Sequence, residues 1–140
     1  MITNVINENH IIAFKKSLKD VHTLKTMCVG NFNPLSNRSC EAIQTAHKSL
    51  HTYNFVKNSN PILVVPVFKR KFIDDSVWES SMCGLSNHRL VDYVIDVRSI
   101  NLISVIDRFF PDFVFVDRFM KTDSQFDLYA KKSRIKIVRV

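Results

Sequence analysis

Two short polar segments carry the residue types that bind phosphate groups. Residues 30–39 (GNFNPLSNRS) contain a glycine and several polar residues, and they end with Ser36, Arg38 and Ser39. If a helix follows, its dipole and the free N–H groups of its first turn would attract an anion. The second segment is the basic triplet at residues 69–71 (KRK). Each has an ordinary alternative, a strand-to-helix turn and a solvated basic turn, but together they favour one phosphate-sized site.

The histidines, cysteines and paired carboxylates form no pattern typical of a metal or nucleophilic site. His47 and His51 are four residues apart, but no glutamate lies between them and no third ligand follows, so we interpret them as surface residues. The cysteines are Cys28, Cys40 and Cys83. They are odd in number and form no C-x-x-C, which argues against zinc and disulfide frameworks and suits a reducing compartment. We interpret Asp74 and Asp75 as part of a solvated loop, so we predict no metal site.

Glycine content and charge limit the kinds of phosphate site that the chain can build. The 140 residues include only 2 glycines, whereas average usage of about 7% would give about ten. A dinucleotide fingerprint or a phosphate loop needs two glycines within a few residues, and both are therefore excluded. Lys and Arg number 20 against 13 Asp and Glu, a net charge of +7. This charge attracts phosphates, but it does not choose among nucleotides, nucleic acid and other anionic partners.

Alternating strands and helices are expected to position these segments. The predicted strands are residues 24–30, 62–68, 91–97, 113–116 and 134–140, and the predicted helices are residues 7–20, 37–50, 99–109 and 122–131. Residues 69–90 are the least readable part and include a possible helix. This pattern predicts one domain, residues 1–140, with a three-layer α/β sandwich, a five-stranded parallel Rossmann-like sheet and a helical extension at 1–22. Ligands bind such sheets beyond the carboxyl ends of the strands, where both polar segments should lie.

Local signals predict several details of these elements. Pro66 lies inside the apolar run 62–68 and should cause a bulge or a break in the hydrogen-bonded ladder. Ser36 or Asn37 should cap the helix that begins at residue 37, and Ser99 should cap the helix that follows it. The T-x-x-Q sequence that begins at Thr122 is typical of a capping box at the start of the last helix.

Residues 27–48 (MCVGNFNPLSNRSCEAIQTAHK) resemble the first strand, loop and helix of the nucleotidylyltransferase superfamily, the cytidylyltransferase-like group. The pattern of that family reads G-[T/S]-F-D-x-x-H-x-G-H, followed by a helix with Ala-Lys near its end. The matching positions are Gly30, Phe32, Pro34, Ala46 and Lys48, with Asn33 in place of the Asp, Ser36 and Ser39 in place of the two histidines, and Arg38 in place of the second glycine. Residues 91–116 resemble the heptose and glycerol-phosphate branches, and residues 117–119 replace the glycines that follow there.

The resemblance implies a reaction in which a phosphate-bearing acceptor attacks the α-phosphorus of a nucleoside triphosphate and pyrophosphate leaves, with Mg²⁺ arriving on the nucleotide. A serine donates a weaker, neutral hydrogen bond than a charged histidine does. The family's S/T-S-T-x-x-R segment also has no counterpart before Val140. We therefore expect a divergent member, a pseudoenzyme that binds a nucleotide or phosphate ligand with weak or no transferase activity. The alternatives are an active adenylyl- or cytidylyltransferase and a basic nucleic-acid-binding or assembly module.

These expectations assign residues, partners and location. Any catalysis would come from Ser36, Arg38 and Ser39. The expected nucleotide- or phosphate-binding residues are Gly30, Asn31, Phe32, Asn33, Lys69, Arg70, Lys71 and Asp117. Nucleic acid is the least favoured partner, because no aromatic-rich basic motif is visible, and a second copy of the chain is a further candidate. The longest apolar run is far shorter than the ~20 residues of a membrane span and no signal peptide is visible, so we expect a cytoplasmic protein without membrane contact.

Overall fold

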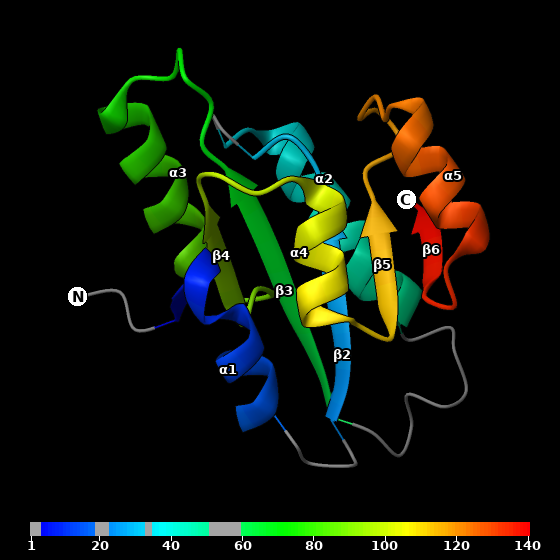
Figure 1. Cartoon of the computed structure of the whole chain (residues 1–140). Coiled ribbons are helices and arrows are strands. Elements are labelled where there is room, and N and C mark those ends of the chain that lie inside the picture. Colours follow the sequence, from blue (N-terminus) through cyan, green and yellow to red (C-terminus); the bar gives the residue numbers. More distant parts are fainter. Residues whose placement is uncertain (1–3, 19–22, 33–34, 51–59) are drawn as a thin grey trace.

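The computed structural model describes residues 4–18, 23–32, 35–50 and 60–140. This part of the chain forms a parallel β-sheet with helices on both faces (Figure 1). The strands are β1 (Val5–Asn7), β2 (Thr23–Val29), β3 (Asn60–Phe68), β4 (Tyr93–Val97), β5 (Phe113–Val116) and β6 (Lys136–Arg139). The helices are the 3₁₀ turn η1 (Glu8–His10), α1 (Ile11–Ser17), α2 (Asn37–Leu50), α3 (Asp75–Ser86), α4 (Leu102–Phe109) and α5 (Ser124–Lys132).

The order of strands in the sheet is β1-β4-β3-β2-β5-β6, and every pairing is parallel. The five strands from β2 to β6 run outward from β2 in both directions, which is the order of a Rossmann-like sheet. Strand order reverses between β2 and β5, where Met27 is paired with Val114. Loops at the carboxyl ends of these strands therefore meet at the topological switch point, the usual place for a ligand in this kind of sheet.

The predicted parallel α/β sheet is confirmed, but the predicted number of five strands is wrong. The sixth strand, β1, lies inside the segment predicted as a helical extension, and it adds to the edge of the sheet beside β4. Val5 is paired with Val94 and Ile6 with Ile95. Three residues are too few to show a strand periodicity in the sequence, so only the exposed edge of β4 selects this conformation. The helix α1 consequently begins at Ile11 instead of residue 7.

Pro66 does not cause a bulge. The register between β3 and β4 continues through Pro66, paired with Ile95, to Phe68, paired with Val97. The register between β3 and β2 ends at Val64, two residues before the proline. The predicted interruption is thus confined to the β2 side, where β3 no longer needs a backbone donor.

Two helix caps lie one or two residues from the predicted positions. Asn101 caps α4, because its Oδ1 accepts a hydrogen bond from the N–H of Ser104 at 2.9 Å, whereas Ser99 bonds to Glu8 instead. Asp123 caps α5 through a bond from the N–H of Phe126 at 2.8 Å. Thr122 donates to Asp127 and does not take part in a capping box. In both cases the predicted residue has another partner, Glu8 for Ser99 and Asp127 for Thr122, and a residue that follows it provides the cap.

Each face of the sheet buries a hydrophobic cluster against its own helices. Alternation along β2 sends Cys28 toward α2 and α3, and sends Met27 and Val29 toward α1, α4 and α5. These two layers hold the carboxyl ends of the strands rigidly in place. Among the described residues, no helix is long and apolar enough to cross a membrane.

Candidate functional site

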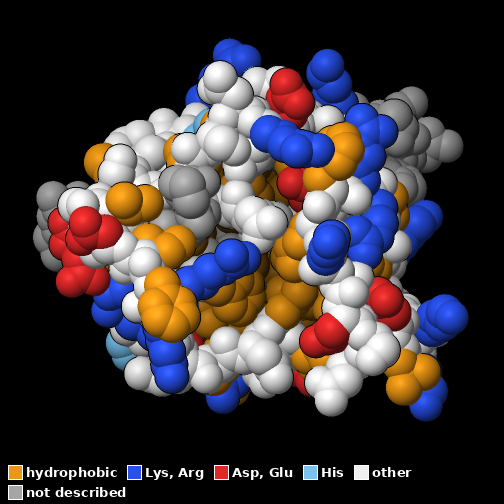
Figure 2. Space-filling view, turned by 90° about the horizontal axis from the view of Figure 1, so that it is seen from above, with side chains coloured by type: hydrophobic (Ala, Val, Ile, Leu, Met, Phe, Trp, Pro, Cys, Tyr) orange, Lys and Arg blue, Asp and Glu red, His pale blue; other side chains and the backbone are white. Residues whose placement is uncertain are grey.

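A pocket of about 290 Å³ lies at the carboxyl ends of β2 and β3. Its lining residues are Gly30, Asn31, Phe32, Val67, Phe68, Arg70, Asn101, Leu102 and Met120. It lies beyond Met27 and Val64, where the pairing of β2 with β3 ends, so the two strands leave room between their loops. Figure 2 shows this edge of the sheet, with a hollow whose floor is hydrophobic and with Lys and Arg side chains around it. The volume is at the lower end of small-molecule sites, roughly 300–1,000 Å³.

The pocket wall contains a hydrogen-bonded pair, Asn31 and Arg70. Arg70 Nη2 donates to Asn31 Oδ1 at 2.9 Å, and the two residues follow the neighbouring strands β2 and β3. A guanidinium carries five N–H groups and an amide carries two, so most of the donors of this pair have no acceptor among the described residues and can bind an anion. The structure thus brings together residues of the two polar segments, as the parallel sheet predicted.

Gly30 lines the pocket at a position where the space for a side chain is tight. A Cβ at this position would lie 3.2 Å from Cζ of Phe32 and 3.3 Å from Cβ of Asp117. Asp117 is buried and does not line the pocket, and its Oδ1 accepts the N–H of Phe119 at 3.0 Å. Burial, together with the negative charge of Asp117, raises the pKa of the Cys28 thiol to about 12. Cys28 therefore stays protonated and is no nucleophile.

Ser36 and Ser39, two of the predicted catalytic residues, are bound to each other and to the loop. The Ser39 hydroxyl donates to the carbonyl of Asn31 at 2.6 Å, and the Ser36 and Ser39 hydroxyl oxygens lie 2.9 Å apart. Each hydroxyl has one proton, so Ser36 donates in the second bond. Ser36 also accepts the N–H of Ser39 and caps α2, as predicted. Neither serine has a proton left for a ligand.

Arg38 is turned toward the loop that follows β5. Its Cζ lies 3.8 Å from the centre of the Phe119 ring, which is a close stacking distance. Arg38, Ser36 and Ser39, the predicted catalytic residues, do not line the pocket. Asn33, a predicted binding residue, lies outside the described residues.

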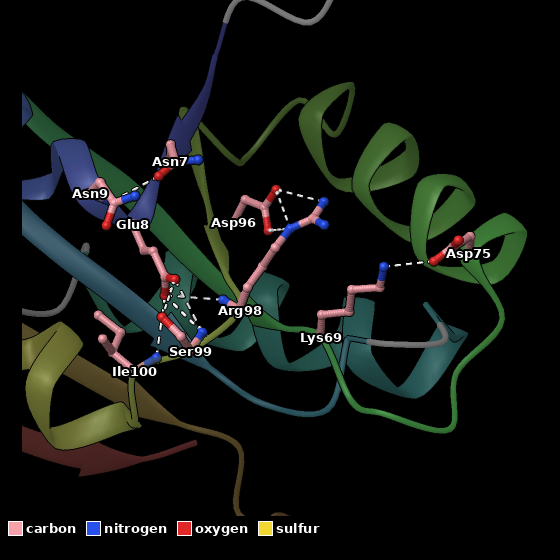
Figure 3. Close-up of polar contacts among 9 residues, drawn as sticks. All are labelled: Asn7, Glu8, Asn9, Lys69, Asp75, Asp96, Arg98, Ser99 and Ile100. Atoms are coloured by element: carbon pink, nitrogen blue, oxygen red, sulfur yellow. Dashed lines mark hydrogen bonds and ion pairs between the residues drawn. The ribbon is translucent and has the colours of Figure 1, made fainter.

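The three residues of the basic triplet, residues 69–71, lie in three different environments. Lys69 Nζ lies 2.6 Å from Asp75 Oδ1, and this hydrogen bond and charge lower the pKa of the Asp75 carboxyl (Figure 3). Lys71 is exposed. Among the three residues of the triplet, Arg70 alone lines the pocket.

Sequence reasoning predicted the helix α4 within residues 99–109, but it did not place the start of this helix among the site residues. Asn101 and Leu102 at the start of α4 line the pocket together with Met120. The N–H groups of Leu102 and Ile103 have no acceptor among the described residues, because Asn101 caps only the N–H of Ser104. An adjoining pocket of about 180 Å³ shares Asn101, Leu102 and Met120 and extends toward α5. A polar residue directly before an apolar run was the available signal for this helix start.

A second cluster of donors, at the loop that follows β4, is already filled by a carboxylate of the chain (Figure 3). Glu8 accepts hydrogen bonds from the Ser99 hydroxyl at 2.6 Å and from the backbone N–H groups of Arg98, Ser99 and Ile100 at 3.0 to 3.3 Å. Burial pushes the pKa of Glu8 upward, but the hydrogen bonds from residues 98–100 outweigh it and lower the pKa to about 2. Glu8 stays ionised and fastens η1 to the sheet.

The described residues contain no group of three or more His, Cys, Asp or Glu side chains that could hold a metal ion.

Comparisons with known proteins identify a fold. No protein-family model matches the chain, and no curated protein matches it. The structure is similar to the crystal structure of a lipopolysaccharide core biosynthesis protein from Thermoplasma volcanium, with a TM-score of 0.59 and 20% sequence identity over 84% of this chain and 95% of that chain. At this identity the likeness shows the fold alone. It supports a Rossmann-like α/β fold and is compatible with the nucleotidylyltransferase-like fold expected from residues 27–48.

Proposed function

We propose that the pocket at the carboxyl ends of β2 and β3 binds the phosphate groups of a nucleotide or a related phosphate ligand, and that nucleotidyl transfer there is weak or absent. The observation that carries this proposal is the Asn31–Arg70 pair in the pocket wall. Arginine matches phosphate geometry because its planar guanidinium donates two parallel hydrogen bonds. The amide hydrogens of Asn31, which have no acceptor among the residues described, add neutral donors beside it.

The start of α4 supports the same ligand from the opposite wall. Leu102 lines the pocket, and the first-turn N–H groups of Leu102 and Ile103 are free among the described residues. These groups carry the positive end of the helix dipole, which favours an anion. An arginine on one side and a helix start on the other make the pocket electropositive, although its floor is largely apolar. An apolar floor with a few placed donors suits a nucleotide better than a free inorganic anion.

The absence of strong transfer follows from the residues at the family's catalytic positions. The protons of Ser36 and Ser39 are used within the loop, and Arg38 is stacked on Phe119. Removing one donor that stabilises transition-state charge typically costs about 100- to 1000-fold in rate. With three such positions turned to other contacts, binding can persist where catalysis does not.

Calorimetric titration with ATP, CTP, GTP and UTP, each with and without Mg²⁺, tests this proposal. We expect at least one nucleotide to bind, and Arg70→Ala to weaken it by about 10- to 100-fold, because hydrogen bonds to charged groups contribute about 1.5–3 kcal/mol. The control is Arg134→Ala, which removes an exposed arginine before β6 at the opposite edge of the sheet. Nucleotide binding that is unchanged in Arg70→Ala, or no binding at millimolar concentration, would overturn the site.

A pyrophosphate-release assay with phosphate-bearing acceptors tests the second half of the proposal. We expect no release above background. Sustained release that is lost in Ser39→Ala would instead identify an active nucleotidyltransferase with a rearranged site.

A further inference from the structure

Two highly exposed phenylalanines lie at the carboxyl ends of the strands, on the same side of the molecule as the pocket. Phe72, in the loop after β3, is 98% exposed, and Phe119, in the loop after β5, is 55% exposed. Strands β3 and β5 are the two neighbours of β2, so they lie about 10 Å apart across it. Exposed aromatic rings on both sides of a pocket are costly in water and indicate a surface that binds a partner.

Cations accompany both rings. Arg38, Arg70, Lys71, Arg118 and Lys121 lie in the loops or first helical turns at this edge, and none of them forms a salt bridge with a described acidic side chain. We call these five residues, with Phe72 and Phe119, the aromatic-basic rim.

The carboxylates near the rim offset it only in part. Asp74, two residues after Phe72, is exposed and opposes the cations, whereas Asp75 is paired with Lys69, Asp117 is buried, and Asp123 caps α5. The rim therefore keeps an excess of positive charge, and Figure 2 shows Lys and Arg side chains spread around the hollow.

We propose that the aromatic-basic rim binds single-stranded nucleic acid across the mouth of the pocket. Bases stack on exposed aromatic rings and on guanidinium planes without sequence preference, while cations bind the phosphate backbone. The Cζ of Arg38 already lies over the Phe119 ring at 3.8 Å from its centre, so the guanidinium adds a second stacking group beside that ring. This inference goes beyond nucleotide binding in the pocket, because it rests on Phe72, Phe119 and cations that do not line the pocket, in addition to Arg70.

The shape of this edge favours a single strand over a duplex or a lipid bilayer. The rings of Phe72 and Phe119 are on separate loops around a hollow, so a flat membrane would leave the pocket and its polar donors empty. A duplex hides the faces of its bases, and the rings would then have nothing to stack on. A flexible strand follows a concave surface and presents both bases and phosphates to it.

Fluorescence anisotropy with labelled 12-nucleotide dT and U oligomers tests the proposal at 50 mM salt. Each stacked base is worth about 5- to 150-fold in affinity, so we expect Phe72→Ala and Phe119→Ala each to weaken binding at least fivefold. Phe72→Ala should leave the affinity for mononucleotides unchanged. Phe110→Ala is the matched control, because Phe110 is 49% exposed beside Lys15 at the opposite edge of the sheet.

Salt dependence gives an independent readout. For single strands, each neutralised phosphate contributes about −0.7 to the slope of log K against log salt. Arg118→Ala combined with Lys121→Ala should reduce the steepness of this slope by about 1.4.

Several outcomes would overturn the proposal. These are the absence of oligomer binding at low salt, equal affinity of the control and rim variants, and tighter binding to a 12-base-pair duplex than to the single strands. Binding to phosphatidylserine vesicles that depends on Phe72, without oligomer binding, would assign the rim to membranes instead. Failure of oligomer binding with intact mononucleotide binding would overturn only the rim, whereas the reverse result would overturn only the pocket.

Discussion

Two anion-attracting regions lie at the same edge of the sheet, and they differ in what fills them. The loop after β4 directs three N–H groups and a serine hydroxyl at Glu8, a carboxylate of the same chain. The loops after β2 and β3 instead surround a pocket in which Asn31 and Arg70 have donors that meet no acceptor in the part of the chain that the structure describes. One region is closed by the chain itself and the other is open to a ligand.

Hydrogen-bond donors at the carboxyl ends of the strands thus have a structural role in one region and can have a binding role in the other. Parallel strands place backbone donors and helix starts at their carboxyl ends wherever the chain turns. A buried carboxylate that receives four hydrogen bonds contributes to folding, because its removal leaves several donors unsatisfied. A donor pair at a pocket wall adds little to folding and remains available for binding. The four predictions below test this contrast through stability.

The largest effect is expected at the closed region. Glu8→Gln should lower the free energy of unfolding by about 2–4 kcal/mol, because an amide offers one acceptor oxygen and turns an N–H₂ group toward other donors. Urea unfolding measures the change. Glu79→Gln on the exposed side of α3 is the control and should change stability by less than about 0.5 kcal/mol. Equal unfolding curves for both variants would contradict a structural role for Glu8.

The same carboxylate should produce a dependence of stability on acid. The folded-state pKa of Glu8 is about 2, below its ordinary value of 4.5. Its contribution is therefore fully present above pH 4.5 and is lost as the pH falls toward 2. Urea midpoints measured between pH 6 and pH 2 should fall more steeply in the wild type than in Glu8→Gln. Parallel curves would show that other carboxylates account for acid unfolding.

A smaller effect on stability is expected at Ser39, a buried residue whose hydroxyl supports the loop that carries Asn31 in the open region. Ser39→Ala removes the hydroxyl that donates to the Asn31 carbonyl and should cost about 1–2 kcal/mol. Ser76→Ala, at an exposed position in the first turn of α3, serves as the control. If Ser39→Ala is neutral in urea unfolding, the loop does not depend on this hydrogen bond.

The smallest effect on stability is expected at the open region. Arg70→Ala should change the free energy of unfolding by less than about 0.5 kcal/mol, since Arg70 is exposed and the side-chain hydrogen bond that it forms within the described part of the chain is to an exposed side chain. Its effect should appear in ligand binding alone. A loss of stability as large as that of Glu8→Gln would mean that the pair is structural and that the two regions do not differ.

Much of the fold could be predicted because its signals are local. The predicted bounds of α2 and β5, residues 37–50 and 113–116, match the structure, since caps and apolar runs lie within the elements themselves. The three-residue strand β1 could not be predicted, because its conformation depends on the edge of β4, about 90 residues away. The true caps Asn101 and Asp123 each lay close to a predicted cap that had another partner.

The candidate site was predictable only in outline. A parallel sheet alone implies that the loops after β2 and β3 meet, and Gly30, Asn31, Phe32 and Arg70 line one pocket. The directions of the side chains were not predictable, because they depend on partners from other elements. Lys69 turns to Asp75 and Arg38 to Phe119 for this reason.

The sequence by itself determined the alternation of strands and helices, the parallel sheet and the edge at which to look for a ligand, because hydrophobic periodicity and connection rules act along the chain. Tertiary structure alone decided which donors are filled and which stay free. Glu8 reaches residues 98–100 across about 90 positions, and Phe72 and Phe119 share one edge although 46 positions separate them. The proximity of residues so far apart in the sequence depends on the order of the strands in the sheet, which no short stretch of sequence encodes.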